Sequence, residues 1–262
     1  MLLPVNITLG IVLALLLAAA AGIAAFASLG RSRQIVLAGL RAAAQLAAVS
    51  SLIGWVVHAF APTFAFIALM FGVAVWTAGH RVTDNRTWRW VALPIGAGVV
   101  PVVAVLLLTG LVPVRGIALI PVTGILIGGA LTATVLGGRR ALDELATRHG
   151  EVEAAMALGF PDRDARLEIA RPAASDALLP GLDQTRTVGL VTLPGAFVGM
   201  LLGGASPVQA GAVQLFVLVA LMAVQAAAVA TVLELVARGR LHREAADAPV
   251  TGRRGAAAAA GR

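Results

Sequence analysis

The sequence predicts an all-α fold: a polytopic membrane helix bundle with about seven transmembrane helices. Composition, the length of the apolar runs and the placement of the arginines all point to it. Hydrophobic residues make up 59% of the 262 residues and charged residues 13%, whereas roughly 25% of the residues in a soluble domain are charged. With a mean hydropathy of +0.92, the chain is expected to be a multi-pass protein of the plasma (cytoplasmic) membrane, surrounded by the lipid bilayer.

Seven apolar runs come close to the length of about 20 residues that a helix needs to cross the hydrocarbon core. The first is expected to be a retained helix and not a signal peptide, because no basic residue precedes it and the run is too long. The sixth could begin as early as Leu178. The predicted spans are about 7–29, 35–57, 64–78, 91–111, 117–136, 188–202 and 213–236.

The arginines predict the orientation of these spans. They follow the odd-numbered spans, whereas the alternate loops carry only Arg115. Cytoplasmic loops accumulate basic residues, so the N-terminus is expected outside and the C-terminus inside. The same rule accounts for the net charge of +7, and no nucleic-acid partner is expected. The arginines concerned are Arg31, Arg33, Arg81, Arg86, Arg89, Arg139, Arg140, Arg238, Arg240, Arg243, Arg253 and Arg254.

A polar island over about 138–177 separates the fifth and sixth spans and falls on the cytoplasmic side. Residues 139–157 are good helix formers with one apolar face, and Gly150 is a candidate interruption. Gly159 stands where a helix often ends in a left-handed residue, and Pro161 prevents continuation. The island therefore predicts a helix-turn-helix.

The second helix of the island is expected to be capped by Asp162 and to end at Pro172, or to give way there to the next helix. The pattern EAA-x3-G-x9-I-x2-P in this compartment indicates a coupling element that contacts another protein. Glu153 is available for an ion pair across such an interface, and the small alanines after it allow close approach. The alternative is a loop that folds against its own bundle. The predicted coupling residues are Glu153, Ala154, Ala155, Gly159, Pro161, Ile169 and Pro172.

The chain contains no lysine and no cysteine. A phosphate-binding P-loop requires a lysine, so ATP hydrolysis is expected on a separate partner. No nucleophile triad or carboxylate pair is visible, and the four histidines have no metal-ligand spacing. We therefore predict a protein that is not an enzyme, with no catalytic or metal site and no cofactor of its own. ATP and magnesium are expected on the partner.

Ionisable residues within spans are costly and are candidates for function. Arg41 and Gln45 share one face of the second span, where Arg41 either lines a polar path or extends to the interface. The segment 179–187 combines helix breakers with Asp183 and Arg186, which are spaced to pair. Bracing of the island against the membrane is favoured there over substrate contact. The predicted path or bracing residues are Arg41, Gln45, Asp183, Arg186 and Thr187.

Two series of glycines follow the small-xxx-small spacing of closely packed membrane helices. They are predicted to pack helices within a protomer or across a dimer, and consist of Gly124, Gly128, Gly195, Gly199 and Gly203. Residues 1–238 are expected to form one transmembrane permease domain. Residues 239–262 are expected to form a basic, low-complexity cytoplasmic tail.

Four segments of the chain are characteristic of one family of membrane proteins. They are RAAAQL at 41–46, IPVTGILIGGAL at 120–131, EAAMALGFP at 153–161 and, most specific, LLPGLDQTRTVGLVTLPG at 178–195. Through them the chain resembles the FetB-type ABC permease family, which includes a bacterial iron-export permease and plant permeases of aluminium tolerance. The resemblance covers about 41–238 and implies a homodimeric permease that works with two copies of a cytoplasmic ABC ATPase and exports iron. Arg171 departs from the general EAA pattern, in which an apolar leucine precedes the proline.

Two other classes of function stay open on the residues alone. An autonomous secondary carrier or channel is favoured by Arg41 and Asp183, which lie within or near the bilayer. A membrane scaffold without transport leaves the polar junction at 180–187 unexplained. The ATPase-coupled permease accounts for the island, its compartment and the missing P-loop together.

Overall fold

The computed structural model describes residues 6–56, 59–112 and 115–243, and these ranges are helical almost throughout. Six of the described helices are long and apolar enough to cross a membrane, which confirms the all-α membrane bundle. The helices are α1 (Ile7–Phe26), α2 (Ser32–Val56), α3 (Phe60–Val82), η1 (Arg86–Val91), α4 (Ala92–Leu108), α5 (Gly116–Thr147), α6 (His149–Ala157), α7 (Asp162–Ser175), η2 (Asp176–Leu178), α8 (Leu179–Thr187), α9 (Gly195–Leu202) and α10 (Pro207–Ala237). Val57, His58, Arg253, Arg254 and the tail over 244–262 lie outside the described residues.

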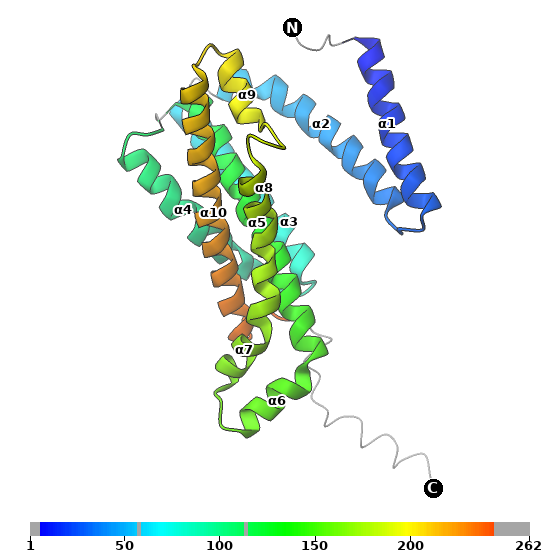
Figure 1. Ribbon diagram of the computed structural model, residues 1–262, viewed down its shortest axis with the longest axis vertical. Helices are drawn as coiled ribbons and strands as arrows, with labels where there is room; N and C mark the ends of the chain where they lie inside the picture. Colours follow the sequence, from blue (N-terminus) through cyan, green and yellow to red (C-terminus); the bar gives the residue numbers. More distant parts are fainter. Residues whose placement is uncertain (1–5, 57–58, 113–114, 244–262) are drawn as a thin grey trace. The chain divides into compact units, whose positions relative to one another are not determined.

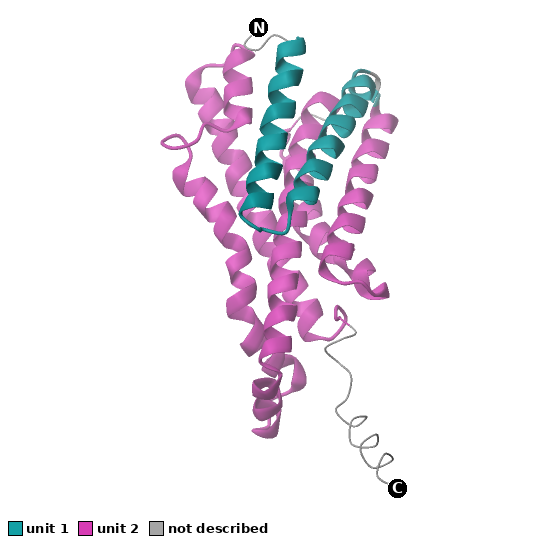
Figure 2. Cartoon of the chain, turned by 90° about the vertical axis from the view of Figure 1, so that its right-hand side faces the viewer, with its two compact units in different colours: residues 1–59 teal, residues 60–262 magenta. Residues whose placement is uncertain are grey.

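The chain forms two compact units, Met1–Ala59 and Phe60–Arg262 (Figure 2). Unit 1 is a helical hairpin of α1 and α2. Asn6 caps α1, because its side-chain oxygen accepts a hydrogen bond from the Leu9 N–H at 3.0 Å. The two helices approach closely at Gly39, where a Cβ would lie 2.7 Å from the Leu17 methyl groups.

Unit 2 is built around two long parallel helices, α5 and α10, with α3 and α4 packed beside them (Figure 1). Glycines on α5 allow the close approach, as small residues do between membrane helices. A Cβ at Gly129 would lie 2.2 Å from a Leu221 methyl group, and one at Gly138 would lie 3.1 Å from Val82 and 3.2 Å from Val232. The core of the bundle therefore lies along one face of α5.

Helix α5 extends well beyond the predicted fifth span. The span and the first part of the island form one continuous helix of 32 residues, because Ala141 and Leu142 continue its buried face. The interruption falls at Arg148, whose φ of −109° and ψ of 32° end α5. The interruption predicted at Gly150 is wrong, since this glycine lies inside α6. Arg148 holds the corner through ion pairs with Glu144 and Glu151, and its hydrogen bond lowers the pKa of Glu151.

The predicted sixth span is not one continuous helix. Helix α8 ends at Thr187, a turn follows, and α9 begins only at Gly195. Gly189 adopts a φ of 83° and donates its N–H to the Thr192 carbonyl at 2.9 Å. Pro194 lacks an N–H and has an extended backbone, so the helix cannot pass through it. The continuous helix expected over 188–202 is therefore wrong, and this stretch consists of a turn followed by the short helix α9.

Helices α7, α8 and α9 run antiparallel to α10 (Figure 1). Helix α7 packs against the C-terminal part of α10, η2 and α8 follow, and α9 reaches its N-terminal part. The helices on either side of the turn, α8 and α9, contact α10, whereas the turn itself is exposed, with Leu190 93% and Val191 77% exposed. The polar island and the arginine-bearing ends of α3, α5 and α10 consequently meet at one end of unit 2. The positive-inside rule predicts that this end faces the cytoplasm, and we call it the cytoplasmic end.

Candidate functional site

The cytoplasmic end of unit 2 carries a helical hairpin made of α6 and α7. Its turn is a Schellman motif: the Phe160 N–H donates to the Ala155 carbonyl at 3.1 Å, and the Gly159 N–H donates to the Met156 carbonyl at 2.9 Å. Gly159 has a φ of +95°, in the left-handed region that favours glycine. The glycine thus reverses the chain between the two helices.

Helix α7 begins one residue earlier than the predicted cap implies. Pro161 occupies the cap position, and its carbonyl accepts the N–H groups of Asp164 and Ala165 at 2.9 and 3.0 Å. Asp162 is the first helical residue, so its assignment as the N-cap is wrong. Its carboxylate accepts a hydrogen bond from Arg166 Nε at 2.8 Å along the same helix. Acidic residues in a first turn also suit the helix dipole.

Pro172 neither ends α7 nor begins the next helix. The helix continues to Ser175, whose hydroxyl donates to the Pro172 carbonyl at 2.7 Å, and leads into η2 and α8. A proline removes one N–H from a helix but does not stop it where neighbouring bonds compensate. The predicted end at Pro172 is therefore wrong, and α7, η2 and α8 form a nearly unbroken path from the hairpin toward the membrane.

The predicted coupling residues divide into a surface set and a packing set. Glu153 and Ala154 are exposed, and Glu153 lies 3.5 Å from His149 Nδ1. Ile169 is buried with Val152 and Ala165 in a small apolar cluster that joins α6 to α7. Ile169 therefore holds the hairpin together and is not part of its surface. Of the other predicted coupling residues, Ala155 is half-buried, whereas Gly159, Pro161 and Pro172 are exposed.

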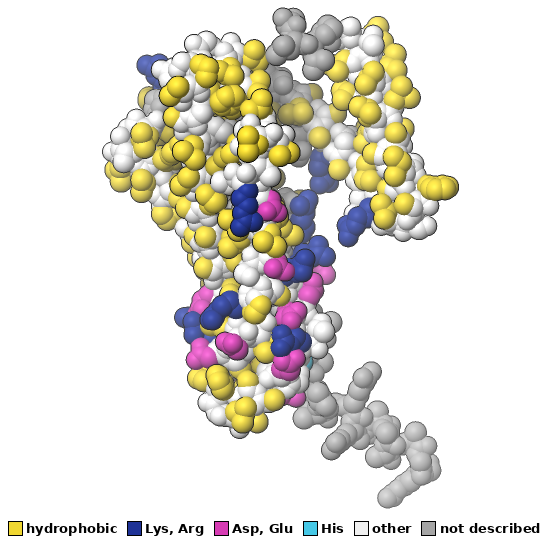
Figure 3. Space-filling model, viewed as in Figure 1, with side chains coloured by type: hydrophobic (Ala, Val, Ile, Leu, Met, Phe, Trp, Pro, Cys, Tyr) yellow, Lys and Arg dark blue, Asp and Glu magenta, His cyan; other side chains and the backbone are white. Residues whose placement is uncertain are grey.

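The tip of the hairpin exposes apolar side chains that the sequence reasoning missed. Leu158 is 82% exposed, Phe160 52% and Met156 38%. Figure 3 shows hydrophobic side chains at the lower tip of the molecule, beyond a zone of acidic and basic side chains. The available signal was the run LGFP inside a charged island. An exposed apolar patch of this kind with a polar rim is typical of a protein contact.

A bidentate ion pair ties the hairpin to α10. Arg163 donates through Nε and Nη2 to the two carboxylate oxygens of Glu234, each at 2.8 Å. Arg238 also donates to this carboxylate. The Glu234 carboxylate raises the pKa of Arg163 by accepting these bonds. Glu234 is the single acidic residue of α10, and its isolation in an apolar helix was the signal that could have found it.

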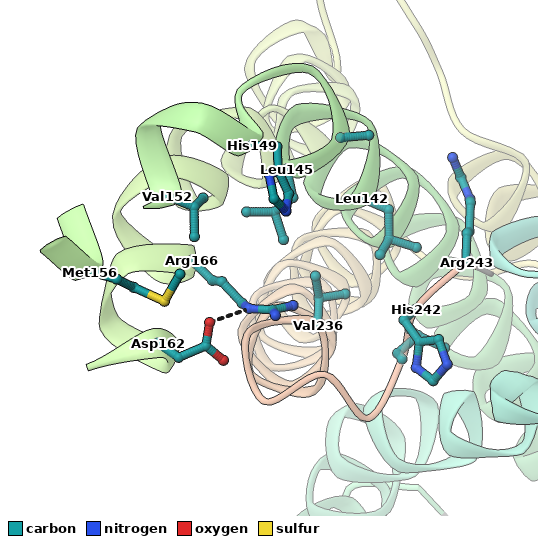
Figure 4. A pocket seen from close by; sticks show the side chains of 12 residues that line it. Leu142, Leu145, His149, Val152, Met156, Asp162, Arg166, Val236, His242 and Arg243 are labelled. Carbon is teal, nitrogen blue, oxygen red and sulfur yellow. Dashed lines mark hydrogen bonds and ion pairs between the residues drawn. The ribbon is translucent and has the colours of Figure 1, made fainter. Parts of the chain in front are cut away.

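A pocket of about 410 Å³ opens between the end of α5, the α6–α7 hairpin and the residues after α10 (Figure 4). The ion pair of Asp162 and Arg166 lies on one side of it, with Met156 beside them. Its walls are mainly apolar. The lining residues are Leu142, Leu145, Ala146, His149, Val152, Met156, Asp162, Arg166, Val236, Leu241, His242 and Arg243.

The first residues of the predicted tail pack on the bundle. Leu241 is fully buried, and the His242 carbonyl accepts hydrogen bonds from Thr83 Oγ1 at 2.7 Å and from Asn85 Nδ2 at 2.8 Å. Arg243 donates to the Val82 carbonyl at 3.0 Å. We call residues 239–243 the C-terminal strap. It joins the end of α10 to the junction between α3 and η1.

The polar junction predicted at 179–187 forms α8. Asp183 and Arg186 pair at 3.5 Å, and the Thr187 hydroxyl donates to the Asp183 carbonyl at 2.8 Å. Both partners belong to α8 and their side chains are about two-thirds exposed, so this pair joins α8 to no other element. Gly181 makes the close contact instead, because a Cβ there would lie 2.0 Å from Gln225 Oε1 of α10.

The remaining predicted residues lie on exposed surfaces or at close helix contacts. Arg41 and Gln45 are exposed on α2 of unit 1. Gly124 allows Met70 of α3 to approach, since a Cβ would lie 2.8 Å from the Met70 methyl group. Gly203 faces the carbonyls of its own helix, and Gly128, Gly195 and Gly199 have no atom within 4 Å of a Cβ position.

The bundle and its hairpin define a class: a multi-pass helical membrane protein with a helical hairpin at its arginine-bearing end. The chain belongs to the family described as "Uncharacterised protein family (UPF0014)", whose sequence profile matches residues 7–240. This finding confirms the family resemblance seen in the sequence. No solved structure matches the chain.

Named relatives come from plants and bacteria. The chain is 37% identical over 180 residues to "Protein ALUMINUM SENSITIVE 3" of Arabidopsis thaliana, which covers 68% of this chain and 63% of the plant protein. It is 32% identical over 197 residues to "UPF0014 membrane protein STAR2" of Oryza sativa subsp. japonica, covering 74% and 69%. It is 28% identical over 163 residues to "Probable iron export permease protein FetB" of Escherichia coli (strain K12), covering 61% of each. The chain thus spans less than two thirds of the length of the first of these relatives.

Proposed function

We propose that this chain is the membrane-spanning permease subunit of an ABC transporter that exports a metal, iron, and is driven by a separate cytoplasmic ATPase. The α6–α7 hairpin carries the proposal, because it combines the EAA pattern, a Schellman turn and an apolar tip at the cytoplasmic end. Membership of the family supports a permease. The relative named as a probable iron export permease supports iron as the cargo.

In the proposed transport cycle, this chain receives motion from the ATPase and transmits it to the spanning helices. ATP and magnesium bind to the partner ATPase, which contacts the hairpin at its exposed tip. The path through α7, η2 and α8 leads from the hairpin to the turn at Gly189, and Arg163 links the same hairpin to α10. A displacement of the hairpin therefore reaches both this turn and the last spanning helix.

The working unit is proposed to be a homodimer with two copies of the ATPase. Gly195 and Gly199 lie one turn apart on α9, and no atom of the described residues lies within 4 Å of a Cβ position at either. Membrane helices associate through such small residues, because the backbones can approach closely. A second copy of the chain is a suitable occupant of this face.

Reconstitution in liposomes tests the proposal. Iron movement is expected to require the ABC ATPase, magnesium and ATP together, and the chain alone is expected to move none under an ion gradient. The alternative class, an autonomous carrier or channel, rests on the exposed Arg41 in a candidate span. Gradient-driven transport by the purified chain alone would establish that alternative and refute the coupled permease.

Replacing both Leu158 and Phe160 with serine is expected to weaken ATPase binding by about 30-fold or more, since the loss of one hot-spot residue of an interface costs about 2 kcal/mol or more. Both side chains are exposed in the free chain, so its thermal stability should change little. Titration of the purified ATPase onto the permease measures the effect. Ala157→Ser, one position away and also exposed, is the control, and equal binding by all three proteins would contradict the role of the tip.

A further inference from the structure

The short helix η1 presents two arginines on one face at the cytoplasmic end of unit 2. It is a 3₁₀-helix, RTWRWV, and leads directly into α4. Such a helix has three residues per turn, so Arg86 and Arg89 lie one above the other. Both are exposed. Asn85 fixes the start of η1, because its side-chain oxygen accepts the Thr87 N–H at 2.9 Å.

Tryptophans alternate with these arginines. The Arg89 guanidinium carbon lies 5.9 Å from the centre of the Trp88 ring, and that of Arg240 lies 4.9 Å from the Trp90 ring. His80 extends the stack, with ring centroids 5.0 Å from Trp88 and 5.2 Å from Trp76. Trp90 is 37% exposed and Trp76 56%, so the surface offers both guanidinium groups and flat apolar rings.

The C-terminal strap supplies Arg240 from far along the chain. The hydrogen bonds from Thr83 and Asn85 to the His242 carbonyl hold the strap against the start of η1. This anchoring keeps Arg240 over Trp90. The surface is therefore assembled from two distant segments, and its arginines do not belong to one flexible loop.

The arginines of this surface differ from three arginines at or beside the hairpin in having no carboxylate partner. Arg148, Arg163 and Arg166 are all in ion pairs. Within residues 6–56, 59–112 and 115–243, no ion pair involves the four exposed arginines near η1, which are Arg81, Arg86, Arg89 and Arg240. Asp84 is the one carboxylate in the segment 83–91, and it also forms no ion pair with any other described residue. The surface keeps a net positive charge.

We propose that this surface binds the phosphate group of an anionic phospholipid in the cytoplasmic leaflet. Arg86, Arg89 and Arg240 would bind the phosphate oxygens, since guanidinium groups suit phosphate geometry. Trp76 and Trp90 would pack along the glycerol and upper acyl chain, because tryptophan favours the depth of the headgroups. The exposed rings favour a lipid over a soluble phosphate, which has no apolar part to cover them. This site does not depend on the proposed transport function.

Native mass spectrometry of the purified chain tests the site with phosphatidylglycerol and phosphatidylcholine supplied at equal concentration. The natural chain is expected to retain phosphatidylglycerol with about tenfold preference or more, given the attraction of each arginine for anionic lipid. Replacement of Arg86, Arg89 and Arg240 with glutamine is expected to remove most of this preference. The single variant Arg86→Gln, which changes no contact described within the chain, is expected to remove part of it without affecting folding.

The matched control replaces Arg33, Arg139 and Arg171 with glutamine, three exposed arginines that also lack ion pairs within the described residues. It removes the same charge and is expected to keep the preference. Equal losses in both triple variants would show attraction by net charge and overturn the site, as would unchanged retention in the η1 variant. If inorganic phosphate displaces the lipid when both are present at the same concentration, the arginines bind a soluble anion. This result would also overturn the proposal.

Discussion

Arg163→Ala is expected to lower ATP-driven transport about 5- to 100-fold, the range of common coupling free energies, while the ATPase still binds and hydrolyses ATP. The physical reason is the position of the ion pair. Arg163 lies on the hairpin, whereas Glu234 belongs to the last spanning helix, and two hydrogen bonds of 2.8 Å join them. Without this link the hairpin can move with the ATPase while α10 keeps its position.

We expect the amount of iron transported per ATP hydrolysed to fall, whereas the free energy of unfolding should change little. The side chains of Arg163 and Glu234 are 45% and 31% exposed, and partly exposed pairs of this kind contribute about 1 kcal/mol or less to folding. Transport and ATP hydrolysis measured in the same liposomes give the ratio directly. A lower ratio with an unchanged melting temperature is the expected result.

Arg166→Ala is the matched control for Arg163→Ala. Arg166 lies on the same helix and carries the same charge, but its ion pair is with Asp162, one turn away on α7. Its replacement should leave the transport ratio near that of the natural chain. The exchanged pair, Arg163→Glu with Glu234→Arg, should restore part of the ratio, because the link is re-formed with reversed charges. Full coupling in Arg163→Ala alone would refute a role for this link.

The sequence was sufficient to predict the class of fold, whereas the compartment of the island stays a prediction from the arginines. Length and hydropathy determine which runs can span a bilayer, and the arginines determine which loops stay inside. Gly159 was predictable because a left-handed residue between two helices strongly favours glycine. These features depend on local properties of the chain, which a single sequence displays.

The failures have a common physical origin in tertiary packing. The stretch 188–202 is mostly apolar, and mean hydropathy does not register that Gly189 and Pro194 interrupt the helix. The link from Arg163 to Glu234 joins positions 71 residues apart, and no local pattern records such a pairing. Pro172 was expected to end a helix on propensity, yet α7 continues through it. Pairing across elements cannot be read from periodicity.

Gly159→Val is expected to reduce ATPase binding by about tenfold or more, through the backbone and not through a clash. Gly159 has a φ of +95°, and no atom lies within 4 Å of its Cβ position. A left-handed residue other than glycine costs roughly 1–2 kcal/mol, more when it is β-branched. The hairpin is held by a small cluster of Val152, Ala165 and Ile169. This cluster provides little packing energy to offset the strain. The turn should open and displace the apolar tip.

Three substitutions of Gly159 distinguish backbone strain from side-chain size as the cause of the loss of binding. Gly159→Asn should bind nearly as well as the natural chain, because asparagine tolerates the left-handed region, while Gly159→Ala should fall between asparagine and valine. Gly150→Ala is the control, since Gly150 lies inside α6 with open space around it, and alanine should favour this helix by up to about 1 kcal/mol. Binding titrations and hydrogen exchange of residues 149–175 measure both effects. If asparagine, alanine and valine all abolish binding equally, the ATPase must contact Gly159 itself, and conformational strain is not the cause.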